Sequence, residues 1–119
     1  MNDKVNLAQK FDSFTEHFQQ HIVGELNGQE VKIAKVKGEF IWHHHEDADE
    51  MFFVVKGSLT IQLRDRDVQI GEGEFFIVPR GVEHRPVAVE EAHIMLFEPA
   101  DTLNTGNVRN DRTYEATRA

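Results

Sequence analysis

The sequence predicts an all-β fold with one short helix outside the sheet. From residue 20 onward apolar and polar residues alternate with a period of two, and turn residues interrupt this pattern every few positions. Eight or nine short strands at this spacing predict a sandwich or a closed barrel. With 119 residues, the chain has the length of one domain that can bury a core of its own.

The first 18 residues have a different period. Leu7, Phe11, Phe14 and Phe18 recur every three or four residues, which is the spacing of one helical face. We therefore expect one short amphipathic helix, so that a helix and a hairpin over residues 5–29 precede the barrel core. The apolar face predicts that the helix packs on the sheet as a lid. The alternative is that the helix covers a partner subunit.

The expected strands follow in order. The first two, 21–26 and 30–37, flank Asn27-Gly28, which is a strong hairpin signal. The others are 39–45, 50–55, 58–64, 67–70, 75–78, 85–89 and 92–98, separated by turn residues at 56–57, 65–66, 71–73 and 79–81. The polar residues 102–119 predict an irregular strap followed by a frayed tail.

Composition excludes several classes of function. The 13 Lys and Arg against 21 Asp and Glu give a net charge of −8, which argues against binding to nucleic acid or to anionic membranes. The absence of cysteine removes disulfides, thiolate metal ligands and cysteine nucleophiles. The apolar runs are too short to span a membrane, and the N-terminus has no apolar signal segment, so we expect a cytoplasmic protein.

Three of the seven histidines are consecutive. In a strand His43 and His45 project to one face, while His44 points to the other. A returning hairpin strand can bring Glu50 to the same interior, and His84 follows a tight turn where another strand begins. Three imidazoles and one carboxylate suit a divalent ion such as zinc, iron(II), nickel, manganese or copper(II).

Two spaced motifs resemble those of the small single-domain cupins. The first motif is a glycine, His-X-His, a glutamate and a second glycine; the second is a glycine, Pro-X-Gly and a histidine. The matching residues are Gly38, His43, His45, Glu50 and Gly57 in the first motif, and Gly73, Pro79, Gly81 and His84 in the second. The chain departs from the pattern twice: four residues rather than five separate Gly38 from His43, and Ala88 stands where an asparagine is expected.

The resemblance implies a double-stranded β-helix, the jelly-roll cupin barrel of the cupin type-2, mannose-6-phosphate isomerase-like and RmlC-like proteins. It implies one domain over residues 1–119 with the barrel core at about 30–98. It also implies one divalent metal ion held by His43, His45, Glu50 and His84. Ala88 is not one of the four ligands, so its departure leaves the expected metal site in place.

Two functions fit this resemblance. One is a metal-dependent enzyme of the isomerase or dioxygenase type that acts on a small oxygenated metabolite. The alternative is a non-catalytic module that binds or senses a metal or a small molecule, since no ionisable residue besides the ligands is placed to face the ion. Exposed sheet surface and edges also predict a homodimer.

Other residues have weaker assignments. We expect His44 to face away from the ion, and His17, His21 and His93 to lie outside the site. Asp47 and Asp49 either orient imidazole N–H groups or form a solvated acidic turn. Alternation predicts that the interior is lined by Ile41, Phe52, Val54, Ile61, Phe76, Val78, Val87, Met95 and Phe97.

Overall fold

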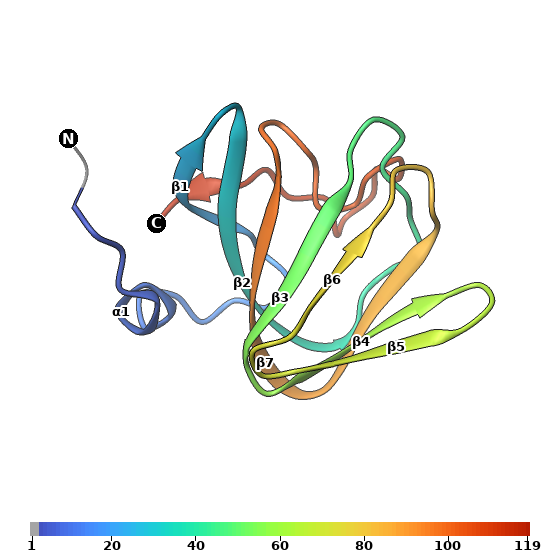
Figure 1. The fold of residues 1–119 in the computed structure, drawn as a ribbon, viewed down its shortest axis with the longest axis horizontal. Helices are drawn as coiled ribbons and strands as arrows, with labels where there is room; N and C mark the ends of the chain where they lie inside the picture. Colours follow the sequence, from blue (N-terminus) through green and yellow to red (C-terminus); the bar gives the residue numbers. More distant parts are fainter. Residues whose placement is uncertain (1–2) are drawn as a thin grey trace.

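The computed structural model describes residues 3–119, so Met1 and Asn2 of the predicted domain lie outside the described residues. Its strands curl into the expected all-β jelly roll, with a short helix beside it (Figure 1). The elements are α1 (Leu7–Phe11), β1 (His21–Leu26), β2 (Gln29–Glu39), β3 (Glu50–Lys56), β4 (Ser58–Leu63), β5 (Asp67–Gly71), β6 (Phe75–Val78), β7 (His84–Pro99) and β8 (Thr117–Arg118). The strand order is β5-β4-β7-β2-β1-β8, and β3 pairs with both β7 and β6.

Strand β7 is the centre of the fold, and here two predicted boundaries are wrong. The expected strands 85–89 and 92–98 form one strand of 16 residues, whose start pairs with β4 and whose second half lies between β2 and β3. The expected strand 39–45 does not form beyond Glu39. Phe40 donates its backbone N–H to Pro86, but Pro86 has no N–H to return, so the ladder cannot continue there.

The N-terminal helix is shorter than the apolar spacing predicts. Asn6 caps its start, and it ends at Phe11, where the Ser13 hydroxyl donates to the carbonyl of Lys10. Such local side-chain bonds compete with helix continuation. Phe14 is nevertheless buried beyond the helix end, so the helical spacing indicated the packing face correctly and the helix length wrongly.

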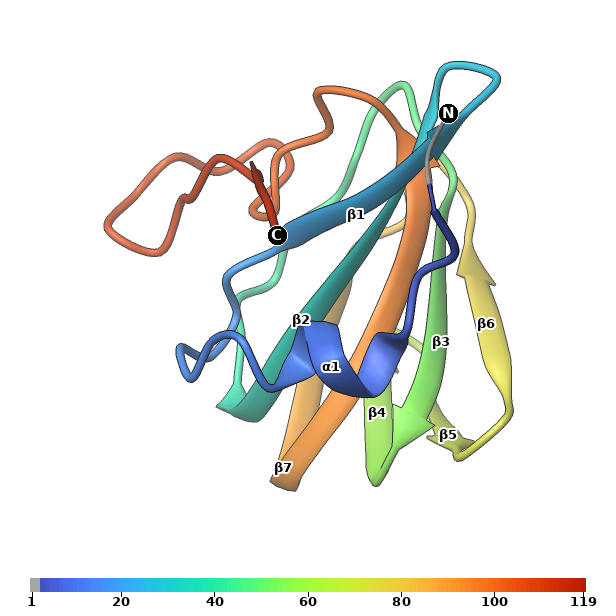
Figure 2. The same cartoon turned by 90° about the vertical axis from the view of Figure 1, so that its left-hand side faces the viewer.

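Two apolar clusters hold the fold together. The larger fills the barrel interior and includes Phe52, Val54, Ile61 and Val78, as expected. The smaller lies outside the sheet, where Phe11 and Phe14 of the N-terminal segment pack on Ile33 of β2 (Figure 2).

On β7 the residues expected inside lie on the outer face. The buried residues of this strand include His84, Ala88, Ala92, Ile94 and Leu96, which alternate with the partly exposed Val87, Met95 and Phe97. Both faces of the strand carry apolar side chains because α1 covers part of the outer face at Met95. Apolar character alone therefore did not identify the inner face.

The C-terminal segment is more ordered than a frayed tail. Asn104 and Thr105 are buried, and β8 pairs in parallel with β1 (Figure 2). Residues 102–114 form a strap that closes one end of the barrel through hydrogen bonds described below.

Among residues 3–119, no helix is long and apolar enough to cross a membrane. The cytoplasmic location remains a prediction.

Candidate metal centre

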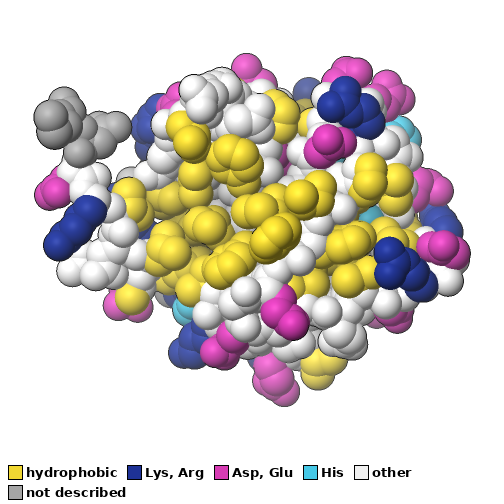
Figure 3. All heavy atoms as spheres, in the orientation of Figure 1, with side chains coloured by type: hydrophobic (Ala, Val, Ile, Leu, Met, Phe, Trp, Pro, Cys, Tyr) yellow, Lys and Arg dark blue, Asp and Glu magenta, His cyan; other side chains and the backbone are white. Residues whose placement is uncertain are grey.

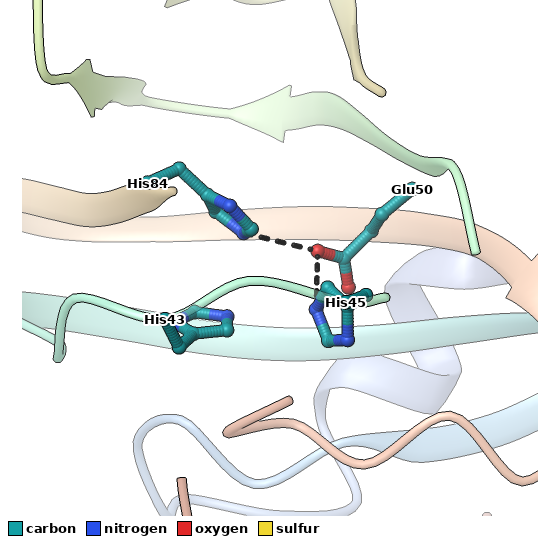
Figure 4. A group of neighbouring side chains, drawn as sticks. All are labelled: His43, His45, Glu50 and His84. Carbon is teal, nitrogen blue, oxygen red and sulfur yellow. Dashed lines mark ion pairs between the residues drawn. The ribbon is translucent and has the colours of Figure 1, made fainter. Parts of the chain in front are cut away.

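The structure brings the four predicted metal ligands together. His43 and His45 lie in the segment between β2 and β3, Glu50 begins β3, and His84 begins β7. One ligand atom from each of the four lies within 4.8 Å of the others, and all four residues are buried (Figure 4). The group could therefore hold a metal ion.

Backbone hydrogen bonds fix the segments that carry these side chains. His43 and His84 exchange both main-chain bonds, with N–O distances of 3.0 and 2.9 Å. The Gly81 N–H in the Pro79-Arg80-Gly81 turn donates to the carbonyl of His45 at 2.8 Å. The turn that the sequence motif contains thus links the third histidine to the first pair.

Two of the imidazoles are held with one defined nitrogen toward the centre. Nδ1 of His43 lies 2.9 Å from the carbonyl of Ile41, and Nδ1 of His84 lies 3.0 Å from the carbonyl of Val82. A carbonyl only accepts, so Nδ1 carries the proton in each neutral ring. Nε2 of both rings is then free to coordinate, which is the arrangement that metal-binding histidines adopt.

Several atoms at the centre are buried without a hydrogen-bond partner. They are Nε2 of His45, Nε2 of His84 and Oε1 of Glu50. The two nitrogens lie 3.1 and 3.4 Å from Glu50 Oε1, close enough for ion pairs (Figure 4) but without hydrogen-bond geometry. Buried polar atoms normally have partners, so three unpaired ones facing a common point fit the coordination of a cation.

Burial and neighbouring groups set the charge state of these residues. Burial and the nearby His84 lower the pKa of His43 to about 4, so the ring is neutral at physiological pH. Burial alone would raise the pKa of Glu50, but the neighbouring Glu98 carboxyl and the His45 and His84 imidazoles lower it well below its usual range. The centre thus offers neutral imidazole and an ionised carboxylate, the forms that bind metal.

Two hollows adjoin the centre. An enclosed cavity of about 30 Å³ touches His43 and Glu50, and most of its wall is apolar or aromatic, including Phe18, Phe40 and Phe52. An open cleft of about 550 Å³ touches His45 and is bounded by residues 46–48, 99–103, 106 and 107. The cavity has room for about two water-sized molecules, whereas the cleft has the volume of a metabolite site.

The C-terminal strap lines both hollows, the cleft through residues 102, 103, 106 and 107 and the cavity through Asn104. Asn107 accepts from the His44 N–H at 2.9 Å and donates its own N–H to the His44 carbonyl at 3.0 Å. Gly106 lies directly on the His43–His44 segment, where a Cβ atom would overlap the His44 carbonyl oxygen. Asn104 lines the cavity from the strap side.

Sequence reasoning missed two charged residues in the barrel interior. Lys32 and Glu98 are buried, and Lys32 Nζ lies 3.0 Å from Glu98 Oε1. Burial and the neighbouring Glu50 carboxylate raise the pKa of Glu98 well above its usual range, against the opposing effect of Lys32. Lys32 lies two and four residues before the buried Ala34 and Val36, so its side chain points to the same face of β2. This alternation is the signal that could have placed Lys32 in the interior.

The remaining histidines lie outside the four-residue group, as expected. His44 lies 3.5 Å from Glu46, His17 and His93 contact Glu91, and His21 stacks on Phe14.

The acidic turn does not orient the imidazoles of His43 and His84. Asp49 accepts from the backbone N–H of Arg80 at 2.8 Å and so braces the turn that follows β6. The imidazole N–H groups of His43 and His84 face backbone carbonyls instead.

Comparisons with known proteins agree with the fold and the residue pattern. The family described as Cupin domain matches residues 29–98. A crystal structure of a cupin-2 domain containing protein from Shewanella frigidimarina superposes with a TM-score of 0.79 at 43% identity, covering 80% of this chain and 93% of the other. The uncharacterized protein YdbB of Bacillus subtilis is 31% identical over 71% of this chain and 76% of its own length.

An enzyme is also similar to this chain. The 3-hydroxyanthranilate 3,4-dioxygenase of Xenopus laevis is 26% identical over 79% of this chain. The match spans only 36% of that enzyme's length.

Proposed function

The chain belongs to the cupin domain family, and on that premise we propose that it is a metal-dependent enzyme of the dioxygenase type acting on a small oxygenated metabolite. One divalent ion would be held by His43, His45, Glu50 and His84. The observation that carries the proposal is the set of inward, unpaired donor atoms on His45, His84 and Glu50. Their nitrogen and oxygen chemistry suits iron(II), nickel, manganese or zinc.

Iron(II) is the ion we favour. The similarity to 3-hydroxyanthranilate 3,4-dioxygenases supports oxygen chemistry, and the enclosed cavity of about 30 Å³ beside His43 and Glu50 suits a diatomic molecule. When bound, iron(II) supplies the redox chemistry that lets dioxygen react with a closed-shell organic molecule. Most of the cavity wall is apolar, which disfavours polar molecules larger than water or dioxygen in this space.

The cleft favours some substrates over others. Its lining includes Glu46, Asp47 and Asp101 and no lysine or arginine. Negative charge at the rim disfavours carboxylates and phosphates. We therefore expect a neutral or amine-bearing substrate with a hydroxyl or carbonyl oxygen, rather than 3-hydroxyanthranilate itself or a sugar phosphate.

Metal content tests the site. Protein purified without a histidine tag or chelator should contain about one equivalent of a divalent ion, measured by elemental analysis after dialysis. The His45→Ala/His84→Ala double variant should lose it, whereas His44→Ala, which removes a neighbour outside the group, should retain it. Unchanged metal content in the double variant would show that the site is misassigned.

Oxygen uptake tests the reaction. Protein loaded anaerobically with iron(II) is exposed to oxygen together with catechol, 2-aminophenol, a neutral diketone, 3-hydroxyanthranilate or a sugar phosphate. Uptake should occur with a neutral or amine-bearing compound and depend on His84. Uptake with none of them would contradict the dioxygenase proposal.

A non-catalytic binding module is the second candidate. Among the described residues that line the small cavity, only His43 and Glu50 are ionisable, and both are candidate metal ligands. A ligand that raises the unfolding temperature of the metal-loaded protein without turnover of any compound would favour this function.

We also propose a homodimer. Phe75 and Ile77 are 59% and 49% exposed on the outer face of the edge strand β6, which is surface that a second copy could cover.

A further inference from the structure

A buried lysine–glutamate pair lies behind the candidate metal ligand Glu50. Lys32 and Glu98 are 1% and 0% exposed, and they project into the barrel from the neighbouring strands β2 and β7. Lys32 Nζ lies 3.0 Å from Glu98 Oε1 and 3.6 Å from Glu30, and it donates to the Thr102 carbonyl at 3.1 Å. All three partners of this lysine therefore belong to the barrel or to the strap.

Stability does not account for this arrangement. Taking charges out of water is costly, and a buried ion pair can often be replaced by apolar residues with no loss of stability. The neighbouring inward residues of the two strands are apolar, with Ala34 and Val36 following Lys32 on β2 and with Ile94 and Leu96 preceding Glu98 on β7. The position of the pair relative to the metal centre offers a different explanation.

Glu98 connects the pair to the metal centre. One of its oxygens accepts from Lys32 Nζ, and the other is buried with no hydrogen-bond partner. Glu98 follows Phe97, which pairs with Met51 in the antiparallel β3–β7 ladder, so it lies across from Glu50, the residue before Met51. Glu50 in turn has Oε1 directed at His45 and His84 (Figure 4). Because a carboxyl group rotates about a single bond, a partner on its far side determines which oxygen faces the histidines.

We propose that Glu98, anchored by Lys32, is a positioning residue that holds the Glu50 carboxyl in the orientation needed for metal coordination. The proposal rests on the metal-binding function proposed above and assigns the residues behind one of its ligands. It predicts that the metal environment depends on a hydrogen-bonding group at position 98. Partners of this kind typically change metal affinity 10–100-fold when they are removed.

The variants separate hydrogen bonding from charge and packing. Glu98→Gln keeps an oxygen for Lys32 and supplies an amide N–H for Glu50, so it should preserve the site. Lys32→Met/Glu98→Met removes the pair without leaving a buried charge. Glu98→Asp keeps the carboxyl group but shortens the side chain, and it provides the test if the double variant does not fold. Glu30→Gln is the matched control, because Glu30 contacts Lys32 but belongs to no contact with Glu50.

Cobalt(II) is the probe, since its visible absorption reports ligand geometry independently of any activity. The wild type, Glu98→Gln and Glu30→Gln should bind one Co²⁺ with the same spectrum and with affinities within about twofold. The double variant and Glu98→Asp should bind about 10–100-fold more weakly with an altered spectrum. Thermal unfolding of each metal-free protein establishes which variants are folded.

Each other outcome decides against the proposal. A folded double variant with the wild-type spectrum and affinity would show that Glu98 only packs. A Glu30→Gln variant as impaired as the double variant would assign the effect to interior charge in general. A wild type that binds no Co²⁺ would overturn both this inference and the proposed metal site, whereas wild-type binding with unaffected variants would overturn the positioning role alone.

Discussion

Two histidines are held in the tautomer that leaves Nε2 free for a metal, and backbone carbonyls close to them in the chain hold them there. The carbonyls of Ile41 and Val82 each lie two residues before the imidazole whose Nδ1 they hold. Such a contact depends on the local backbone conformation and not on the type of residue that supplies the carbonyl. The sequence therefore identified His43 and His84 as ligands but could not identify what orients them.

The burial of His43 gives a pH prediction for the metal-free protein. Its pKa is lowered from 6.5 to about 4, so between these values the unfolded chain binds a proton that the native state does not. The free energy of unfolding should thus fall as pH drops from 6.5 to 4, by up to about 3 kcal/mol from this residue. Urea unfolding in the presence of a chelator measures the effect.

A His43→Gln variant is the control for this prediction. It should lose the part of the pH dependence due to His43. It should keep the part due to His21, whose pKa burial also lowers, and the opposing part due to Glu98, whose pKa is raised. An equal slope in the variant and the wild type would contradict the assignment to His43.

Gly106 is a second residue whose role follows from its surroundings. Its φ is +57°, and a Cβ atom there would overlap the His44 carbonyl oxygen and approach the His43 ring. Gly106→Ala should therefore displace the strap and destabilise the protein by about 1–3 kcal/mol. Faster proteolytic cleavage within 102–119 and a lower unfolding temperature would both be expected.

Gly73→Ala is the matched control for Gly106→Ala. Gly73 also has a positive φ, of +80°, but a Cβ atom there would meet open space. It should cost about 1 kcal/mol and leave the strap protected from proteolysis. Equal proteolysis of the two variants would mean that the contact with His44 does not hold the strap.

The elements were predictable to the extent that alternation distinguishes one face from the other. Turn chemistry located β1 to β6 to within a few residues because glycine, proline and asparagine interrupt the apolar pattern there. It failed at Glu90 and Glu91, where the sequence analysis separated strands 85–89 and 92–98 although β7 continues through both residues.

The inner face of β7 illustrates why apolar character misled the prediction. Met95 and Phe97 on the outer face are as apolar as Ile94 and Leu96 on the inner face. Apolar residues are favourable on the outer face because α1 covers part of it. Counting by twos from His84 identifies the inner residues except at Glu90, which is exposed, and it also places Glu98 inside. Lys32 and Glu98 were missed because lysine and glutamate are almost never fully buried unless they are paired.

The short helix makes a prediction about packing. A helix of five residues is not stable by itself, so α1 depends on contacts with the sheet. Phe11 is 2% exposed against Ile33, and Phe11→Ala should cost about 3–5 kcal/mol in urea unfolding. Metal content should be unchanged, because this cluster lies outside the barrel and the metal centre lies within it.

Val5→Ala is the control for the helix. Val5 is 44% exposed ahead of the helix, so its substitution should change stability by less than about 0.5 kcal/mol. A comparable loss in the two variants would contradict specific packing of Phe11.

At the scale of the whole molecule, one outer face is apolar and only partly covered. Met51, Phe53, Phe75, Ile77 and Phe97 are neighbours across β6, β3 and β7, and we call them the outer patch. Apolar side chains run across this side of the molecule in Figure 3. A net charge of −8 makes two copies repel each other, so association requires a surface such as this one, which lacks charge.

A second copy packed on the outer patch would bury Phe75 and Ile77 in both subunits, because a two-fold axis brings the same surface of each together. Sedimentation should therefore give a species of about twice 13.7 kDa. Phe75→Lys/Ile77→Lys should shift it to the monomer by placing charges in the contact. Val89→Lys, at a position that is 85% exposed but outside the patch, should leave the dimer intact. A wild type that sediments only at 13.7 kDa would exclude the dimer, and a dimer that survives the double substitution would place the interface elsewhere.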